Sequence, residues 1–225
     1  RISKNSYPGI KLVVNSVFSP TTVNYLSTSL QSIIESGVTE IQFSLTNSQP
    51  WNEEALLMLE KKLEVVTGFL ASYYREEGII PLINFRTSGE RYTAKTFACD
   101  GGRRRMTVGP EEDLWGCSYF HGYLKNREKN QDFHRYWFGK LDDFIKNHET
   151  IYPRIITNYD SLRQDCFSTG NNFCFICEDV QNCTVCPVDV TYATDLIGII
   201  PSWICRLNRT LNKGKFKFLE EIGIM

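Results

Sequence analysis

The fold of this chain depends on one stretch, Cys174-Phe-Ile-Cys177-Glu-Asp-Val-Gln-Asn-Cys183-Thr-Val-Cys186, whose four cysteines have the spacing Cx2Cx5Cx2C. The 225-residue sequence holds eight cysteines, of which none lies in the first 98 residues and six lie between Cys166 and Cys205. Two cysteines separated by two residues can present both sulfurs to one metal centre. The clustering therefore predicts metal binding before it predicts disulfides.

The expected compartment supports this interpretation. The N-terminal residues Arg1-Ile-Ser-Lys-Asn-Ser contain no apolar signal core. No apolar stretch approaches the roughly 18 residues that a membrane span requires. We therefore expect a cytoplasmic protein, in a reducing environment where structural disulfides are rare. Thiolates are soft ligands, which favours zinc or an iron-sulfur cluster over calcium or magnesium.

Composition excludes some partners. Hydrophobic residues make up 42% of the chain and charged residues 23%, which are ordinary values for a globular protein. The formal net charge is only -1. No general electrostatic attraction to nucleic acid or anionic lipid follows from it, so we expect neither as a partner.

The first part of the chain alternates between two kinds of pattern. Apolar and β-branched runs predict strands over residues 10–17, 38–45 and 79–85, and helical spacing of apolar residues predicts helices over 23–35 and from Pro50 onward. This order predicts parallel strands joined by crossover helices, an α/β fold. Three such strands do not close a barrel. One sheet edge would then need further strands from a missing N-terminal part or from a partner.

After Arg86 the pattern changes. Glycines, turns and cysteines increase, and helical periodicity persists only weakly over 133–147 and 201–211. Loop-rich regions of this kind are typically held together by metals or disulfides. We therefore predict an α/β domain over residues 1–90 and a loop-rich α+β cysteine domain over residues 91–225.

The spacing of the cysteines leaves two arrangements open. Two Cx2C pairs five residues apart are close together for a single tetrahedral zinc, because four-cysteine zinc sites usually have a longer loop between the pairs. Division of the cysteines between two centres relieves this crowding. Eight cysteines would then supply four ligands to each centre.

Several motifs around the cysteines agree in order with a known family. Cys99 is followed by Val108-Gly-Pro-Glu-Glu-Asp-Leu-Trp-Gly-Cys117, then Tyr136-Trp-Phe-Gly-Lys-Leu, then the Cx2Cx5Cx2C run, then Cys205. This arrangement resembles the SPASM domain, the C-terminal cysteine-rich domain of many radical S-adenosylmethionine (SAM) enzymes. That family has a hairpin with a Pro-Asp-Gly turn and a Pro-Cys end, a Phe-x-x-Gly-Asn-Leu segment and a Cx2Cx5Cx3C run.

The chain departs from the family pattern at three places. The run ends in Cx2C where the family has Cx3C, which affects how Cys186 reaches its cluster. The turn has Glu111-Glu112 in place of Asp-Gly, and Gly116 in place of Pro precedes Cys117.

The resemblance implies a division of the cysteines between two auxiliary 4Fe-4S clusters. One cluster would be held by Cys174, Cys177, Cys183 and Cys205. The other would be held by Cys99, Cys117 and Cys186, with Cys166 either completing it or remaining a free buried thiol. Trp115 and Trp203 each lie two residues before a cysteine of these sets and would shield the clusters from water.

The first part of the chain is similar to the later βα units of the radical SAM partial barrel. Leu12-Val-Val-Asn15 and Glu40-Ile-Gln-Phe-Ser44 would be successive strands, and Asn15 and Gln42 would either face S-adenosylmethionine or pack inward. The family's Cx3Cx2C loop, which holds a third 4Fe-4S cluster, does not occur in this sequence. The resemblance therefore implies the C-terminal portion of such an enzyme, which would not perform radical chemistry alone.

The same resemblance implies partners and a reaction class. The whole enzyme would use S-adenosylmethionine to modify a peptide or protein substrate, with electrons from a donor such as flavodoxin or ferredoxin. Its auxiliary clusters would relay electrons or engage the substrate.

Two other functions remain open from the residues. The first is a zinc-stapled protein-interaction module, with a structural zinc on Cys174, Cys177, Cys183 and Cys186. The second is acid-base hydrolysis, for which His121, His134 and His148 are the available bases. No nucleophile stands at a recognisable spacing from these histidines. The run Arg103-Arg104-Arg105 is either a solvated turn or a contact to a phosphate, a carboxylate or a cluster.

Overall fold

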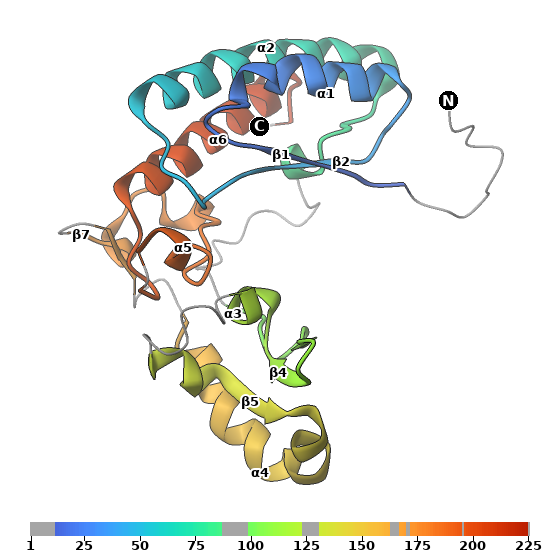
Figure 1. The fold of residues 1–225 in the computed structure, drawn as a ribbon. Helices are drawn as coiled ribbons and strands as arrows, with labels where there is room; N and C mark the ends of the chain where they lie inside the picture. Colours follow the sequence, from blue (N-terminus) through green and yellow to red (C-terminus); the bar gives the residue numbers. More distant parts are fainter. Residues whose placement is uncertain are drawn as a thin grey trace. The chain divides into compact units, whose positions relative to one another are not determined.

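The computed structural model describes residues 12–86, 99–122, 131–162, 167–169, 172–194 and 196–224 (Figure 1). The chain divides into two compact units. The sheet unit comprises residues 1–93 and 206–225, and the cysteine unit comprises residues 94–205. No helix in the described ranges is long and apolar enough to cross a membrane.

The sheet unit has a mixed α/β fold built on two parallel strands. β1 (Val14–Phe18) pairs in parallel with β2 (Ile41–Leu45). The connection between them is a short 3-10 helix, η1 (Val23–Tyr25), followed by α1 (Leu26–Glu35). The parallel strands with a crossover helix agree with the sequence pattern.

The predicted third strand over 79–85 is wrong in extent. Only Leu82 forms a parallel bridge, to Ile41, and the chain then turns into the 3-10 helix η2 (Ile83–Phe85). The amide of Phe43 would extend the ladder in a full strand, but it donates to the side-chain Oδ1 of Asn84 at 3.1 Å. An asparagine side chain thus replaces the backbone acceptor, and the sheet among the described residues has two strands.

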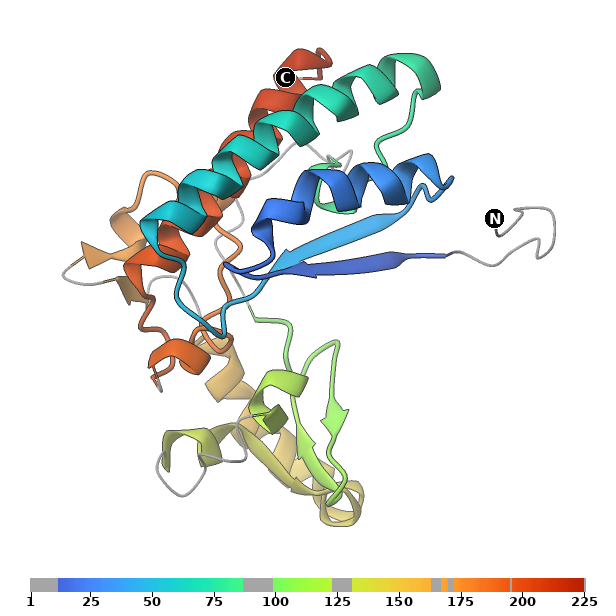
Figure 2. The ribbon, with the colours of Figure 1, turned by 45° about the horizontal axis from the view of Figure 1, so that its top comes forward.

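The long helix α2 (Glu53–Glu77) begins and ends as its sequence predicts. The Asn52 side chain accepts a hydrogen bond from the amide of Ala55 at 2.9 Å, which caps the first turn. The predicted apolar face is buried, with Leu56, Leu59, Leu63, Val66 and Leu70 each at most 4% exposed. Helices α1 and α2 lie on the same side of the strand pair (Figures 1 and 2).

The two faces of the strand pair differ in burial. In β2, Ile41 and Phe43 are buried and Gln42 and Ser44 are exposed. In β1, Asn15 and Val17 are exposed in the same alternation. Helices therefore cover one face, and the opposite face carries polar side chains together with exposed valine.

Helix α6 (Ser202–Glu221) crosses the division between the two compact units, within the range 91–225 that the sequence assigns to one domain. From Arg206 onward the chain belongs to the sheet unit. Ion pairs join α6 to α2 at a constant offset of 153 residues: Arg206 to Glu53, Lys213 to Glu60 and Lys217 to Glu64. A constant offset means that the two helices run parallel.

The apolar face of α6 explains why the helix belongs there. Phe218 is buried, and its ring centroid lies 5.8 Å from that of Phe85, which in turn lies 6.0 Å from that of Phe43. These three rings join α6 and η2 to strand β2.

The cysteine unit begins with an antiparallel sheet. Its strands are ordered β3 (Thr107–Val108), β4 (Asp113–Trp115) and β5 (Trp137–Lys140). Helix α4 (Leu141–Asp160) contacts β5, and the short α3 (Ser118–Gly122) and η4 (Gln131–Tyr136) lie between the strands in sequence. Their buried side chains form what we call the aromatic core: Leu114, Trp115, Phe120, Phe133, Tyr136, Phe138, Ile155, Ile156, Tyr159, Leu162 and Val188.

The rest of the cysteine unit consists of short elements. A small hairpin, β6 (Ser168–Thr169) with β7 (Asn172–Phe173), precedes η6 (Cys174–Ile176), η7 (Val180–Asn182) and α5 (Thr191–Thr194). Their buried side chains form what we call the small core: Phe167, Val185, Val190, Ile200 and Ile204.

The loop-rich prediction for this half underestimated its helices. Both α4 and α6 have 20 residues, whereas the sequence showed only weak periodicity in these regions. In α4, Pro153 lies inside the helix and Asn147 has a non-helical φ of -127°, so two helical pieces are joined across a kink.

Candidate metal centres

Seven cysteines lie in the described residues, and all seven are half-buried and form no disulfide there. The eighth, Cys166, lies outside the described residues. As the described part of the chain stands, no three His, Cys, Asp or Glu side chains are gathered closely enough to hold a metal ion. The thiols nevertheless fall into two groups.

The first thiol group consists of Cys174, Cys177, Cys183 and Cys205. Burial, together with the charges of Cys205, Cys183 and Cys177, raises the pKa of the Cys174 thiol to about 11. Three of the four, Cys174, Cys183 and Cys205, also pack against the small core. Thiols up to 31 positions apart in the sequence therefore share one neighbourhood.

Successive tight turns bring the near members of this group together. The amide of Cys177 donates to the carbonyl of Cys174 at 3.0 Å, and the amide of Val180 donates to the carbonyl of Cys177 at 3.1 Å. The amide of Cys183 then donates to the carbonyl of Val180 at 3.3 Å. Because the chain turns back every three residues, the cysteines at this spacing stay close. Cys205 joins them from the first turn of α6.

The second thiol group consists of Cys99, Cys117 and Cys186, which all pack against the aromatic core. Burial raises the pKa of Cys186 to about 12, and the charge of Cys117 adds to this rise. Burial likewise raises the pKa of Cys99, with a further contribution from Cys117. Cys186 thus lies with the distant Cys99 and Cys117, although only three positions separate it from Cys183.

Backbone amides point at the thiols of the second group. The Cys99 sulfur accepts a hydrogen bond from the amide of Gly101 at 3.3 Å. Amides of the residues two and three positions further on, Tyr119 and Phe120 for Cys117 and Val188 and Asp189 for Cys186, lower the pKa of those thiols against the larger effect of burial. Hydrogen bonds to sulfur favour the thiolate, which is the form that binds a metal.

The hairpin before Cys117 has an unusual backbone conformation at the turn. Glu112 has a φ of 64°, in the left-handed region that favours glycine. Its amide donates to the carbonyl of Gly109 at 2.9 Å, and the amide of Gly109 donates to the carbonyl of Asp113 at 2.9 Å. Glu112 stands where the family pattern has the glycine of Pro-Asp-Gly. The backbone therefore has the glycine conformation although the residue is glutamate.

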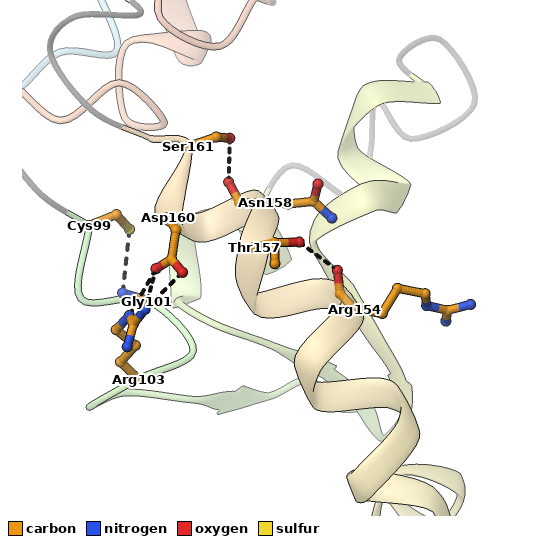
Figure 3. A network of polar contacts seen from close by, with 8 residues as sticks. All are labelled: Cys99, Gly101, Arg103, Arg154, Thr157, Asn158, Asp160 and Ser161. Carbon is orange, nitrogen blue, oxygen red and sulfur yellow. Dashed lines mark hydrogen bonds and ion pairs between the residues drawn. The ribbon is translucent and has the colours of Figure 1, made fainter.

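The loop after Cys99 is tied to the end of α4 (Figure 3). The Arg103 guanidinium donates to both carboxylate oxygens of Asp160, at 2.6 and 2.7 Å from Nη2. The amide of Gly102 donates to the carbonyls of Arg105 and Gly116, at 2.9 and 3.2 Å. The arginine run is thus partly a structural tether.

Arg105 has a different role from Arg103. Its positive charge lowers the pKa of Cys117, although burial and the amides have larger effects. The sequence left open whether the arginine run contacts a phosphate, a carboxylate or a cluster. The charge of Arg105 acts on a candidate ligand, the Cys117 thiol.

Tyr159 of α4 was not recognised from the sequence. Its side chain is fully buried, and its hydroxyl accepts a hydrogen bond from the amide of Gly116 and donates one to the carbonyl of Tyr136, both at 2.7 Å. Burial raises the pKa of Tyr159 far above its usual value, and the charges of Cys117 and Cys99 add to this. No local motif marks this residue, because its partners lie 43 and 23 positions away.

The two tryptophans that lie two residues before a cysteine belong to different cores, as their cysteines do. Trp115 is 1% exposed and belongs to the aromatic core, and Trp203 packs against the small core.

Among the histidines, His134 contacts the Trp137 ring edge-on and His148 lies beside Phe144. These are ordinary aromatic contacts and give no support to a catalytic base at either position. Nothing is described for the side chain of His121.

Asn15 and Gln42 lie in the sheet unit and are direct partners in the register of β1 and β2. Both are exposed on the face that the helices leave uncovered. The structure therefore brings these two candidate cofactor residues together.

The donor set suits a thiophilic centre. Three thiols pack against the small core, with Cys177 near them in the sequence, and three pack against the aromatic core. Soft sulfur donors are the ligands of iron-sulfur clusters and zinc. Neither protein-family models nor curated protein sequences give a match to this chain.

Proposed function

We propose that this chain is the C-terminal part of a radical SAM enzyme that modifies a peptide or protein, and that its cysteine unit holds two auxiliary 4Fe-4S clusters. The first thiol group would hold one cluster. The second thiol group would hold the other, with Cys166 as the candidate for its fourth ligand. The observation that carries the proposal is that Cys183 packs against the small core and Cys186 against the aromatic core, so that these neighbours in sequence fall in different groups.

The chain's own residues would perform two tasks at these clusters. The half-buried positions of the thiols would limit access of water, and Trp115 and Trp203 would add to this at the two cores. Backbone amides of Gly101, Tyr119 and Val188 stabilise negative charge on the sulfurs of the second group. When bound, clusters of this kind accept and pass on single electrons.

The sheet unit supplies a second line of support. Two parallel strands with helices on one face and exposed Asn15 and Gln42 on the other match the expected part of a barrel wall. Asn15 and Gln42 would contact S-adenosylmethionine in the whole enzyme. The Cx3Cx2C loop with its third cluster would come from a region outside these 225 residues, and flavodoxin or ferredoxin would supply electrons.

A zinc-stapled interaction module is the alternative. As predicted from the sequence, this module requires Cys174, Cys177, Cys183 and Cys186 around one zinc ion. The structure instead gathers Cys205 with the first three and leaves Cys186 beside Cys117. A zinc module on this chain would therefore use the first thiol group.

Metal analysis of anaerobically purified protein tests the proposal. We expect a brown protein with about eight iron and eight sulfide per chain, as two 4Fe-4S clusters require. Cys183→Ala and Cys117→Ala should each remove about half of the iron, and the double variant should remove nearly all of it. Thr184→Ala, next to Cys183 and exposed, is the matched control.

The outcomes separate the two functions. A colourless protein with stoichiometric zinc and no iron would establish the zinc alternative. Iron loss that is the same in Cys183→Ala, Cys117→Ala and the double variant would contradict two independent clusters.

A further inference from the structure

Tyr159 holds together the two backbone segments that carry Cys99 and Cys117. Its hydroxyl accepts from the amide of Gly116, the residue directly before Cys117, and donates to the carbonyl of Tyr136 on η4. Both hydrogen bonds are buried and measure 2.7 Å. A single phenol thereby fixes the orientation of the peptide group between Trp115 and Gly116, one residue before Cys117.

The ring of Tyr159 also contacts both segments through glycines. A Cβ atom on Gly116 would lie 2.4 Å from Cζ of Tyr159, and one on Gly101 would lie 2.9 Å from its Cδ1. These distances mean that each glycine backbone lies directly against the ring. The same Cβ on Gly101 would lie 3.1 Å from the Cys99 sulfur. The ring surface thus limits where both thiols can stand.

The aromatic core in turn immobilises the ring. Phe138 stacks on Tyr159 at 5.7 Å between centroids, and Phe120 and Tyr136 contact it edge-on at 5.4 and 5.3 Å. The Tyr159 hydroxyl both accepts and donates a hydrogen bond, and neighbouring aromatic rings enclose the phenol ring. Tyr159 therefore has one available position. A side chain held in this way can transmit its position to the loops that rest on it.

We infer that Tyr159 is a positioning residue for a metal centre on the second thiol group, acting through Gly116 on Cys117 and through Gly101 on Cys99. The inference rests on the proposed function insofar as these thiols bind a thiophilic metal. It adds a residue that supplies no ligand atom. Partners of this outer kind typically change metal affinity about 10–100-fold when they are removed.

Co²⁺ is a suitable probe because its absorption bands report both the number of thiolate ligands and their geometry. The experiment uses the 225-residue chain with Cys174→Ser, Cys177→Ser, Cys183→Ser and Cys205→Ser, so that no thiol of the first group is left to bind Co²⁺. In this background, Tyr159→Phe removes the hydroxyl and keeps the ring. Tyr152→Phe is the matched control, because Tyr152 is also on α4 and stacks on Phe138, and its hydroxyl makes no hydrogen bond with the described residues.

We expect Tyr159→Phe to bind Co²⁺ about 10–100-fold more weakly and to show shifted ligand-field bands at saturating Co²⁺. Tyr152→Phe should match the background protein in both respects. Weaker binding with unchanged bands would overturn the inference, because it would reduce Tyr159 to a stability role. Unchanged affinity and bands would also overturn it and would leave the proposed function intact. No Co²⁺-thiolate bands in the background protein would overturn both.

A measurement on the unmodified chain covers the case in which Tyr159→Phe fails to fold. Hydrogen exchange of the Gly116 amide, which donates to Tyr159, should slow when Co²⁺ binds. Exchange of this amide that is the same with and without bound Co²⁺ would show that Tyr159 and the thiols are not coupled, and would overturn the inference.

Discussion

Leu114 and Gly139 are direct partners across strands β4 and β5, and Gly139 has a φ of 101° there. The pairing lies next to a register irregularity between Leu114 and Trp115. Gly139 is the glycine of the Tyr136-Trp-Phe-Gly segment, so this segment has a glycine where the backbone needs one.

Gly139→Ala should therefore destabilise the chain by about 1–2 kcal/mol, because a left-handed conformation is unfavourable for alanine. The cost would come from the backbone alone, since a Cβ on Gly139 would meet no atom within 4 Å. Urea unfolding measures the change. Gly68→Ala is the control, in the middle of α2 with equally open space. It should stabilise the chain by about 0.5–1 kcal/mol, so equal effects of the two substitutions would contradict the backbone explanation.

Glu112→Gly should stabilise the protein by about 0.5–1 kcal/mol, because glycine adopts the observed φ of 64° at Glu112 without strain. The gain is reduced by the greater freedom of glycine in the unfolded chain. The midpoint of urea unfolding should rise. Glu111→Gly, one position earlier and not in the left-handed region, should lower it. A lower midpoint for Glu112→Gly would show that its side chain outweighs the strain.

Gly116→Ala should be among the most damaging single substitutions in the cysteine unit. Its Cβ would stand 2.4 Å from Tyr159 and 2.6 Å from the backbone nitrogen of Gly102. Neither obstacle can move easily, since one is a buried ring and the other is main chain, so a loss of at least about 3 kcal/mol is expected. Thermal unfolding followed by near-ultraviolet circular dichroism reports it. A near-normal melting temperature would mean that the Cys99 loop shifts freely.

The departure from the family's Pro-Cys pattern has the same explanation. Proline at 116 would lack the N–H that donates to the Tyr159 hydroxyl, and its ring atoms would occupy the space that the phenol fills. Gly116→Pro should therefore be at least as damaging as Gly116→Ala.

Removal of metal should loosen residues 172–194 more than the aromatic core. This segment consists of short turns around the small core, with Phe173, Phe175 and Ile176 each more than half exposed. Ligation would then supply much of its folding free energy. Chelation should accelerate hydrogen exchange and proteolysis within 172–194, with α2 as the internal reference. Protection of this segment that survives complete demetallation would contradict a structural role for the metal.

Much of the sheet unit was predictable from local patterns. Asn52 and the apolar stripe of α2 specify that helix without tertiary information. The loss of the third strand was not predictable, because it depends on the Asn84 side chain, which accepts the hydrogen bond from the amide of Phe43. Helix α4 was obscured by Pro153 and by the kink at Asn147, both of which normally mark helix ends.

The candidate site shows the same division between local and distant information. Spacing alone left the four central cysteines open to one centre or two, and the separate placement of Cys186 depends on Cys99 and Cys117. Tyr159 could not be inferred, because no periodicity or spacing links a tyrosine in a helix to a glycine 43 residues earlier.

The two thiol groups differ in how much of their structure would be ordered before metal binds. Packing against the aromatic core orders Cys99, Cys117 and Cys186 before any metal arrives, so little conformational freedom remains to be lost there. The turns from Cys174 to Cys183 have only a small core and exposed aromatic neighbours, and ordering them falls largely to the metal itself. Stopped-flow mixing with Co²⁺ should resolve this as two phases. Under the proposed function, metal would bind the second thiol group first and would order the cysteine-rich turns from Cys174 to Cys183 last.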